Sequence, residues 1–320
     1  MTTPGKYRHL ARAATAAGHF IILAIDHRLN LTPDQAQSGG ALPDSEVSPL
    51  KQQIVAALMP AGASALLTDP RFGLAPGLRD GWLPTAPGLL APLEETDYSL
   101  HPSQRRFRTL PGWSPAAIQR MGADGVKMLI YYHPEAPDAG RQREAAERVI
   151  TACAKADIPL YLEPIAFSLD PEQPLPPAER TDIVIESARL FSGMGIDVLK
   201  SEFPVDVAEQ PDEAIWKQAL ARLDEASRTP WALLSAGVPY EVFRRQVALA
   251  CEAGASGIIA GRAVWAEVVT LPTEAREAYL QTTARDRMSE LAGLVAAHGR
   301  DFRARTAPPP AFGPAWLDAS

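Results

Sequence analysis

The chain alternates short apolar runs with stretches of helical periodicity along most of its length. Eight runs are candidate strands, at residues 19–26, 64–69, 88–93, 125–131, 159–165, around residue 200, 231–235 and 257–261. Runs that are apolar throughout are typical of parallel strands that are covered on both faces. Eight such strands separated by helices predict an α/β protein with a (β/α)8 TIM barrel, in which reactive residues lie at the C-terminal ends of the strands.

The segments between the strands carry helix signals. A polar helix precedes the first strand, and later helices are expected at 48–59, 114–122, 141–156, 178–194, 212–227, 240–253 and 272–298. Pro49 is expected at the first position of its helix, where proline is tolerated. The Pro-, Gly- and Ser-rich region 30–47 predicts a long functional loop. We expect one barrel domain over residues 1–305 and a proline-rich tail over 306–320, which lies on the surface or crosses to a second subunit.

The composition fits a soluble enzyme. A length of 320 residues is within the range that a single barrel domain reaches. The formal charge of -7 argues against a nucleic-acid partner, and no apolar run approaches the roughly 18 residues that a membrane helix needs. Cys153 and Cys251 form neither a disulfide framework nor a metal-ligand spacing, which favours a reducing cytoplasm. The six histidines also lack zinc-ligand spacing, so we expect no metal site.

Three of the predicted strands carry an ionisable residue inside an apolar run, namely Lys127, Glu163 and Lys200. If the strand faces that carry them converge, two lysines and a carboxylate share one apolar enclosure. A buried lysine loses the solvation of its ammonium group, which lowers its pKa and gives a nucleophilic amine. The alternative is that Lys200 lies at a strand end, where it reaches water or pairs with Glu202.

The loops after the last two strands have the features of a phosphate site. TIM barrels often bind phosphate there, and this chain has the segments 235–238 (SAGV) and 260–262 (AGR) at these places. Small residues let backbone N–H groups approach phosphate oxygens, and Arg262 can add a charge-assisted pair. The alternative for Arg262 is a surface arginine at the start of a helix.

Six segments resemble the class I tagatose 1,6-bisphosphate aldolases, in that family's order from about residue 20 to 266. They are 23–28 (LAIDHR), 122–132 (GADGVKMLIYY), 162–163 (LE), 197–205 (DVLKSEFPV), 234–238 (LSAGV) and 261–266 (GRAVWA). The resemblance implies four catalytic residues: the Schiff-base lysine Lys200, a second lysine Lys127, the acid/base carboxylate Glu163 and the first-strand aspartate Asp26. It also implies substrate contacts at His27, Arg28, Ser235, Gly237, Gly261 and Arg262. The family usually has glutamine in place of His27, so the contacts at that position differ.

The resemblance implies reversible aldol cleavage of a phosphorylated ketose, without metal or other cofactor. The expected products are dihydroxyacetone phosphate and an aldehyde such as glyceraldehyde 3-phosphate. Sulfofructose-phosphate aldolases share this fold and chemistry, so 6-deoxy-6-sulfofructose 1-phosphate is a second candidate substrate. A phosphosugar isomerase or epimerase, or a non-catalytic sugar-phosphate sensor, on the same barrel would leave Lys200 without a covalent role. A homo-oligomer is compatible with each of these.

Overall fold

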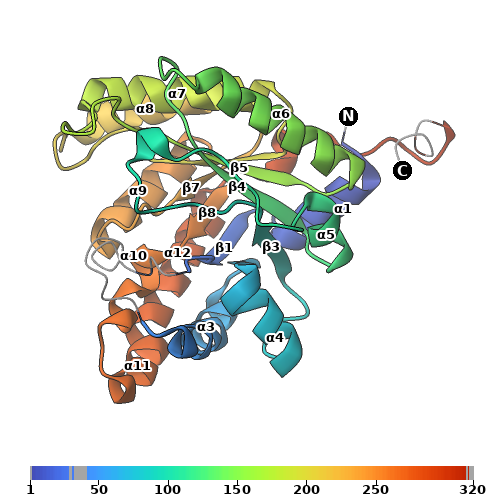
Figure 1. Cartoon of the computed structure of the whole chain (residues 1–320), viewed down its shortest axis with the longest axis vertical. Helices are drawn as coiled ribbons and strands as arrows, with labels where there is room; N and C mark the ends of the chain where they lie inside the picture. Colours follow the sequence, from blue (N-terminus) through green and yellow to red (C-terminus); the bar gives the residue numbers. More distant parts are fainter. Residues whose placement is uncertain (1, 29–30, 32–41, 315, 317–320) are drawn as a thin grey trace.

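The computed structural model describes residues 2–28, 31, 42–314 and 316 and is a closed barrel of parallel strands surrounded by helices (Figure 1). In chain order the strands are β1 Phe20–Ile25, β2 Ala65–Thr68, β3 Gly88–Pro92, β4 Gly125–Tyr131, β5 Leu160–Ile165, β6 Val198–Ser201, β7 Trp231–Leu234 and β8 Gly257–Ala260. Each strand pairs in parallel with the next, and β8 pairs with β1. The predicted (β/α)8 fold is therefore confirmed.

Helices follow the strands and cover the outside of the barrel (Figure 1). Their bounds are α1 Pro4–Ala13, α3 Asp44–Leu58, α4 Ala75–Asp80, α5 Pro115–Arg120, α6 Ala139–Lys155, α7 Pro177–Gly193, α8 Glu213–Ala226, α9 Tyr240–Ala253, α10 Arg262–Trp265, α11 Thr273–Tyr279 and α12 Arg285–His298. Among the described residues, no helix is both long enough and apolar enough to cross a membrane.

Two helices differ from the sequence-based expectation. Helix α3 begins at Asp44, so Pro49 lies inside the helix rather than at its first position. Asp44 and Glu46 occupy the first turn, where the helix dipole stabilises acidic side chains, and this favours a start before the proline. Residues 44–47 of the expected loop 30–47 are therefore helical. Residues 30 and 32–41 of that loop lie outside the described residues. The expected helix 272–298 is divided into α11 and α12 by a π-helical turn, Leu280–Ala284.

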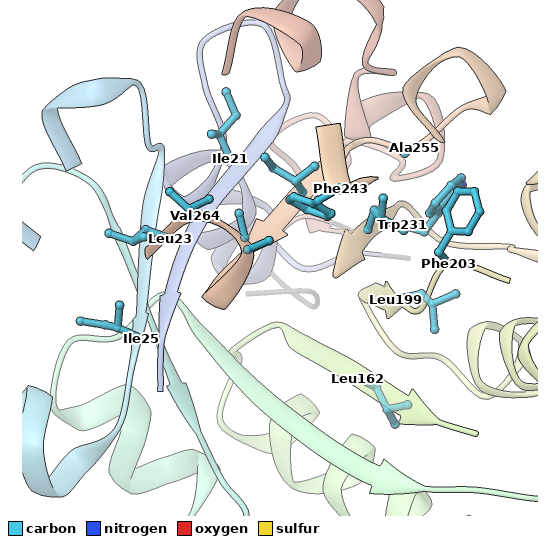
Figure 2. Close-up of a cluster of buried hydrophobic side chains, with 14 of the residues drawn as sticks. Ile21, Leu23, Ile25, Leu162, Leu199, Phe203, Trp231, Phe243, Ala255 and Val264 are labelled. Carbon is cyan, nitrogen blue, oxygen red and sulfur yellow. The ribbon is translucent and has the colours of Figure 1, made fainter. Parts of the chain in front are cut away.

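The two faces of each strand are buried against different partners. Inward-pointing side chains fill the barrel and form one apolar cluster, which includes Phe20, Ile22, Ala24, Ala65, Leu67, Leu90, Tyr161, Val198, Ala232 and Ile259. Outward-pointing side chains pack under the helices, as Ile21, Leu23 and Ile25 on β1 do (Figure 2). Burial on both faces explains why the strands are apolar throughout.

Aromatic rings fill the N-terminal end of the barrel. The ring of Phe20 lies 5.4 Å from that of Phe302 and meets the ring of Tyr161 edge-on at 5.9 Å. Leu10 and Ala13 of α1 belong to the same buried cluster. Because this end is closed by apolar packing, the space for a ligand lies at the opposite end.

Gly257 lies where β8 closes the barrel against β1. It pairs with Phe20 on β1 and with Ala232 on β7. Its φ is +144°, and a Cβ atom at this position would lie 1.9 Å from the carbonyl oxygen of Phe20. Glycine is therefore required both by the backbone conformation and by the close approach of the neighbouring strand.

We expect Gly257→Ala to lower the free energy of unfolding by about 2–4 kcal/mol, because the new methyl group strains the backbone and separates β8 from β1. Gly293 offers a matched control, since it is exposed in α12 and no heavy atom lies within 4 Å of the position of its Cβ. Gly293→Ala should raise the free energy of unfolding by about 0.5–1 kcal/mol. Urea denaturation followed by circular dichroism measures both, and an unchanged stability of Gly257→Ala would contradict this closure geometry.

Candidate active site

A cavity of about 1020 Å³ opens at the C-terminal ends of the strands. It is lined by nine of the predicted site residues: Asp26, His27, Arg28, Lys127, Glu163, Lys200, Ser235, Gly261 and Arg262. Gly237 is not part of the lining, but a Cβ at this position would lie 3.4 Å from the guanidinium group of Arg262. The closed barrel thus brings together side chains from its first strand to the helix after its last.

The ionisable side chains of β4, β5 and β6 meet in the barrel interior, where the Nζ atoms of Lys127 and Lys200 both contact Oε2 of Glu163. Two positions before them towards the N-terminal end are Gly125, Tyr161 and Val198, and the last two belong to the apolar cluster inside the barrel. Glycine at 125 leaves room for the ring of Tyr161, which would lie 2.6 Å from a Cβ there. The two-residue period of the strands therefore carries Lys127, Glu163 and Lys200 from the apolar core to the floor of the cavity.

Lys200 and Lys127 share a single carboxylate oxygen. The side chain of Lys200 is 7% exposed, and its Nζ donates to Oε2 of Glu163 over 2.9 Å. The Nζ of Lys127 lies 3.0 Å from the same oxygen. A carboxylate in this position can take a proton from one amine while the other remains a neighbouring cation.

Lys127 is surrounded by three carboxylates. Its Nζ lies 2.6 Å from Oε1 of Glu94, 3.0 Å from Oε2 of Glu163 and 3.2 Å from Oδ2 of Asp26. Burial opposes the charge, but the carboxylates outweigh it and hold the pKa of Lys127 well above its usual value. Lys127 is therefore a fixed cation. In the described part of the chain, no group of three or more His, Cys, Asp or Glu side chains could hold a metal ion.

The lysines in turn keep two of these carboxylates ionised. Burial alone would raise the pKa of Asp26, but the charges of Lys127 and Lys200 lower it below its usual value. The pKa of Glu163 is lowered in the same way, against the effects of burial and of the Asp26 charge. Both carboxylates can therefore accept protons or hydrogen bonds at neutral pH.

Glu94 was missed by the sequence analysis. Besides its contact with Lys127, its Oε2 accepts a hydrogen bond from the backbone N–H of Leu129 over 3.1 Å. Its backbone oxygen accepts from Nη2 of Arg28 over 2.5 Å. The signal was present, because the two-residue period of β3 continues from Leu90 through Pro92 to position 94, one residue beyond the predicted strand end.

The alternative in which Lys200 pairs with Glu202 is wrong. Glu202 accepts instead from Nη2 of Arg180 over 2.7 Å and from the backbone N–H of Ala166 over 2.8 Å. Burial raises the pKa of Glu202, although the charge of Arg180 opposes this. Glu202 lines the cavity two residues after Lys200, so it extends the same face of β6.

The loops after β7 and β8 are in contact across the cavity wall. The hydroxyl oxygen of Ser235 accepts a hydrogen bond from the backbone N–H of Gly261 over 3.3 Å. The chain after Ser235 turns through two residues with left-handed backbones, Ala236 with a φ of +47° and Gly237 with a φ of +79°. The guanidinium group of Arg262 lies in the space beside Gly237, which a side chain at that position would partly fill.

His27 lies on the same side of the cavity as a neutral imidazole. Its ring meets that of Trp265 edge-on, with centroids 5.4 Å apart. Burial, reinforced by the charge of Arg262, lowers the pKa of His27 well below its usual value although Asp26 opposes this. Within the described chain, its buried Nδ1 atom has no hydrogen-bond partner. This nitrogen lies 3.9 Å from Oδ1 of Asp26.

Comparison with known sequences connects this arrangement to a family. The sequence model of the DeoC/LacD family aldolases matches residues 20–267. The chain is 32% identical over 316 residues to tagatose 1,6-diphosphate aldolase 2 of Streptococcus agalactiae, covering 90% of this chain and 94% of the relative. It is 31% identical over 315 residues to tagatose 1,6-diphosphate aldolase of Lactococcus lactis, with the same coverage of 90% and 94%.

Solved structures share the fold at lower sequence identity. A Schiff-base-forming fructose-1,6-bisphosphate aldolase matches with a TM-score of 0.61 and 21% identity, over 91% of this chain and 99% of that one. The fructose-bisphosphate aldolase of Slackia heliotrinireducens matches with a TM-score of 0.64 and 15% identity, over 90% of both chains. At these identities the likeness shows a common barrel and nothing further.

The fixed charge of Lys127 predicts how stability depends on pH. In the wild-type protein the pKa values of Asp26 and Glu163 are lowered on folding, so their contribution to stability is present above about pH 4 and is lost as the pH falls. In Lys127→Met we expect these pKa values to rise above their usual range, because burial is then opposed mainly by the charge of Lys200. The free energy of unfolding of this variant should then be highest near pH 4 and decrease as the pH rises towards 7.

Urea denaturation at a series of pH values measures this change of slope. Lys217→Met is the matched control, because Lys217 is exposed on α8. It should keep the wild-type pH dependence. If Lys127→Met also kept that dependence, Lys127 would not be the group that holds the carboxylates ionised.

Proposed function

This chain belongs to the DeoC/LacD family of aldolases, and from that membership we propose that it is a class I aldolase that cleaves a phosphorylated ketose through an imine on Lys200. The substrate we propose is like tagatose 1,6-bisphosphate, and the products are dihydroxyacetone phosphate and an aldehyde such as glyceraldehyde 3-phosphate. One observation carries the proposal: the buried amine of Lys200 lies 2.9 Å from a carboxylate oxygen that also contacts the fixed cation Lys127.

Imine formation needs a neutral amine and a group that moves protons. Glu163 is ionised before reaction, so it can take a proton from the ammonium group of Lys200. The amine then adds to the ketone carbon to give a carbinolamine. Glu163 returns its proton to the carbinolamine hydroxyl, which leaves as water and gives the protonated imine.

The protonated imine accepts the electrons of the carbon–carbon bond that breaks. The substrate hydroxyl on the far side of that bond loses its proton to a carboxylate, the aldehyde leaves, and an enamine remains on Lys200. We assign the acceptance of hydrogen bonds from substrate hydroxyls to Asp26, which is ionised and lies beside Lys127. Protonation of the enamine and hydrolysis of the imine release dihydroxyacetone phosphate and restore Lys200.

The residues around β7 and β8 supply an anion site for the phosphate next to the ketone. Ser235, Gly237, Gly261 and Arg262 are close together, and Arg262 brings a positive charge. The neutral ring of His27 lies beside Gly261, and Arg28 lines the same cavity. In this arrangement the phosphate and the imine lie on the same side of the barrel.

A metal-independent reaction is supported by the position of Lys127, whose ammonium group takes the place that a cation would fill among three carboxylates. An isomerase or a sugar-phosphate sensor would leave Lys200, with its buried amine, without a covalent role. The proposed imine mechanism is the same whether the far end of the substrate carries a phosphate or a sulfonate.

The proposal predicts a trapped covalent adduct. Incubation with dihydroxyacetone phosphate and borohydride should add the mass of one reduced adduct, because hydride reduces the iminium to a stable secondary amine. Peptide mapping by mass spectrometry should place it on Lys200. Lys200→Met should form no adduct and lose cleavage, whereas the exposed control Lys217→Met should behave as wild type. Cleavage that stops with a chelator, together with the absence of an adduct, would overturn the proposal.

The anion site predicts a separate effect on affinity. Arg262→Ala should raise KM for the ketose phosphate by about 10- to 150-fold, the effect of losing a hydrogen bond to a charged group. Arg285→Ala is the matched control, since Arg285 is exposed on α12 and bonds only to Gln281 among the contacts of the described chain. Steady-state kinetics measure both, and an unchanged KM in Arg262→Ala would remove this arginine from the site.

A further inference from the structure

Arg105 lies at the mouth of the cavity, on the loop that follows β3. Its guanidinium group is stacked against two tyrosine rings, 4.8 Å from the centroid of Tyr131 and 5.1 Å from that of Tyr98. Its backbone oxygen accepts a hydrogen bond from Nε2 of Gln142 on α6 over 3.3 Å. The side chain is therefore held in one place rather than free in solvent.

The hydrogen bonds of Arg105 leave a defined part of the guanidinium group available. Nε donates to the backbone oxygen of Leu100 over 2.8 Å, Nη1 to the hydroxyl oxygen of Tyr131 over 2.6 Å, and Nη2 to the backbone oxygen of Tyr98 over 3.1 Å. Three of the five N–H groups of an arginine are thus used. Within the described part of the chain, one N–H on each terminal nitrogen has no hydrogen-bond partner, and two such N–H groups can bind two oxygens of a phosphate or sulfonate.

All three acceptors of Arg105 are uncharged. Within the described residues, no carboxylate oxygen lies within 4 Å of its guanidinium group, and the same is true of Arg262. Other cations of the cavity wall have such partners: Lys127 and Lys200 contact Glu163, and Arg71 contacts Asp44. Asp97, in the same loop as Arg105, accepts hydrogen bonds from Ser99 instead. Arg105 and Arg262 are thus two guanidinium groups of the cavity wall that lack a close carboxylate.

The two arginines lie on opposite sides of the barrel mouth. Arg262 follows β8, while Arg105 is anchored to Tyr131 at the end of β4. In the closed ring β4 is four strands from β8 in either direction, and β6 with Lys200 lies halfway between them. A ligand with an anionic group at each end could span the cavity with its ketone carbon against Lys200.

We propose that Arg105 binds the distal anionic group of the substrate and so selects ketose 1-phosphates that carry a second phosphate or a sulfonate at the other end. Tyr131 is a positioning residue, because its hydroxyl oxygen fixes one terminal nitrogen of Arg105. This assignment rests on the proposed aldolase function, and it adds that Arg105 recognises the far end of the sugar.

The test compares kcat/KM for fructose 1,6-bisphosphate with kcat/KM for fructose 1-phosphate, which lacks the distal anion. Arg105→Gln should lower the ratio of the two values by about 10- to 150-fold, the effect of removing a hydrogen bond to a charged group. Tyr131→Phe should lower the same ratio less, since the arginine remains but loses one fixing contact. Arg106→Gln is the matched control in the same loop, because Arg106 points to Asp138 on the surface and does not line this cavity. It should keep the wild-type ratio.

A third substrate, 6-deoxy-6-sulfofructose 1-phosphate, distinguishes the two anions. If Arg105→Gln lowers kcat/KM for only one of the doubly anionic substrates relative to fructose 1-phosphate, that substrate carries the group that Arg105 binds. An unchanged ratio for both, in a variant with the wild-type melting temperature, overturns the assignment.

Borohydride trapping of the wild-type chain with dihydroxyacetone phosphate, which has no distal group, separates the two proposals. An adduct on Lys200 together with an unchanged Arg105→Gln ratio rejects the role of Arg105 alone. The absence of an adduct in the wild type rejects the aldolase function and this inference with it.

Discussion

The ammonium group of Lys127 is the charge on which the cavity depends. Three carboxylates reach it from separate parts of the barrel: Asp26 after β1, Glu94 after β3 and Glu163 on β5. Without a cation between them, these side chains would repel one another in a region of low dielectric constant. The ion cluster therefore fixes the positions of strand ends that are not neighbours in the ring, and it does so where the apolar core ends.

The same cluster gives different roles to Lys127 and Lys200, which occupy similar positions in the sequences of their strands. Among the described residues, Lys127 contacts three carboxylates and stays charged, whereas Lys200 contacts one, that of Glu163. A single oxygen of Glu163 lies between them, so a change in the charge of one amine changes the pKa of the other. In the mechanism we propose, the lysine with fewer ionic contacts is the one that becomes neutral and reacts.

The barrel and the centre of the site could be predicted from the sequence because both follow from short-range periodicity. The alternation of apolar strands and helices defined the fold, and an ionisable residue inside a strand marked Lys127, Glu163 and Lys200. The site residues that this periodicity did not predict lie beyond the strand ends or in loops between elements. Glu94 comes two residues after β3, and its partner Lys127 is known only once β3 and β4 are paired. The orientation of Arg105 depends on a loop that has no period at all. The start of α3 was misplaced because the rule for proline at a helix start was given more weight than the acidic residues before it.

The ion cluster lies on or within two residues of the strands, whereas Arg105 lies well beyond the end of β3, in the loop that leads to α5. The charged groups around Lys127 are built into the barrel, so the loss of one of them leaves buried charges unpaired and endangers folding as well as activity. Arg105 and the tyrosine that stacks beneath it lie in the loop between β3 and α5, outside the eight paired strands. During divergence from a common ancestor, mutations would therefore accumulate more readily in this loop than in the ion cluster. Descendants of such a barrel can change the sugar they accept while inheriting the reaction unchanged.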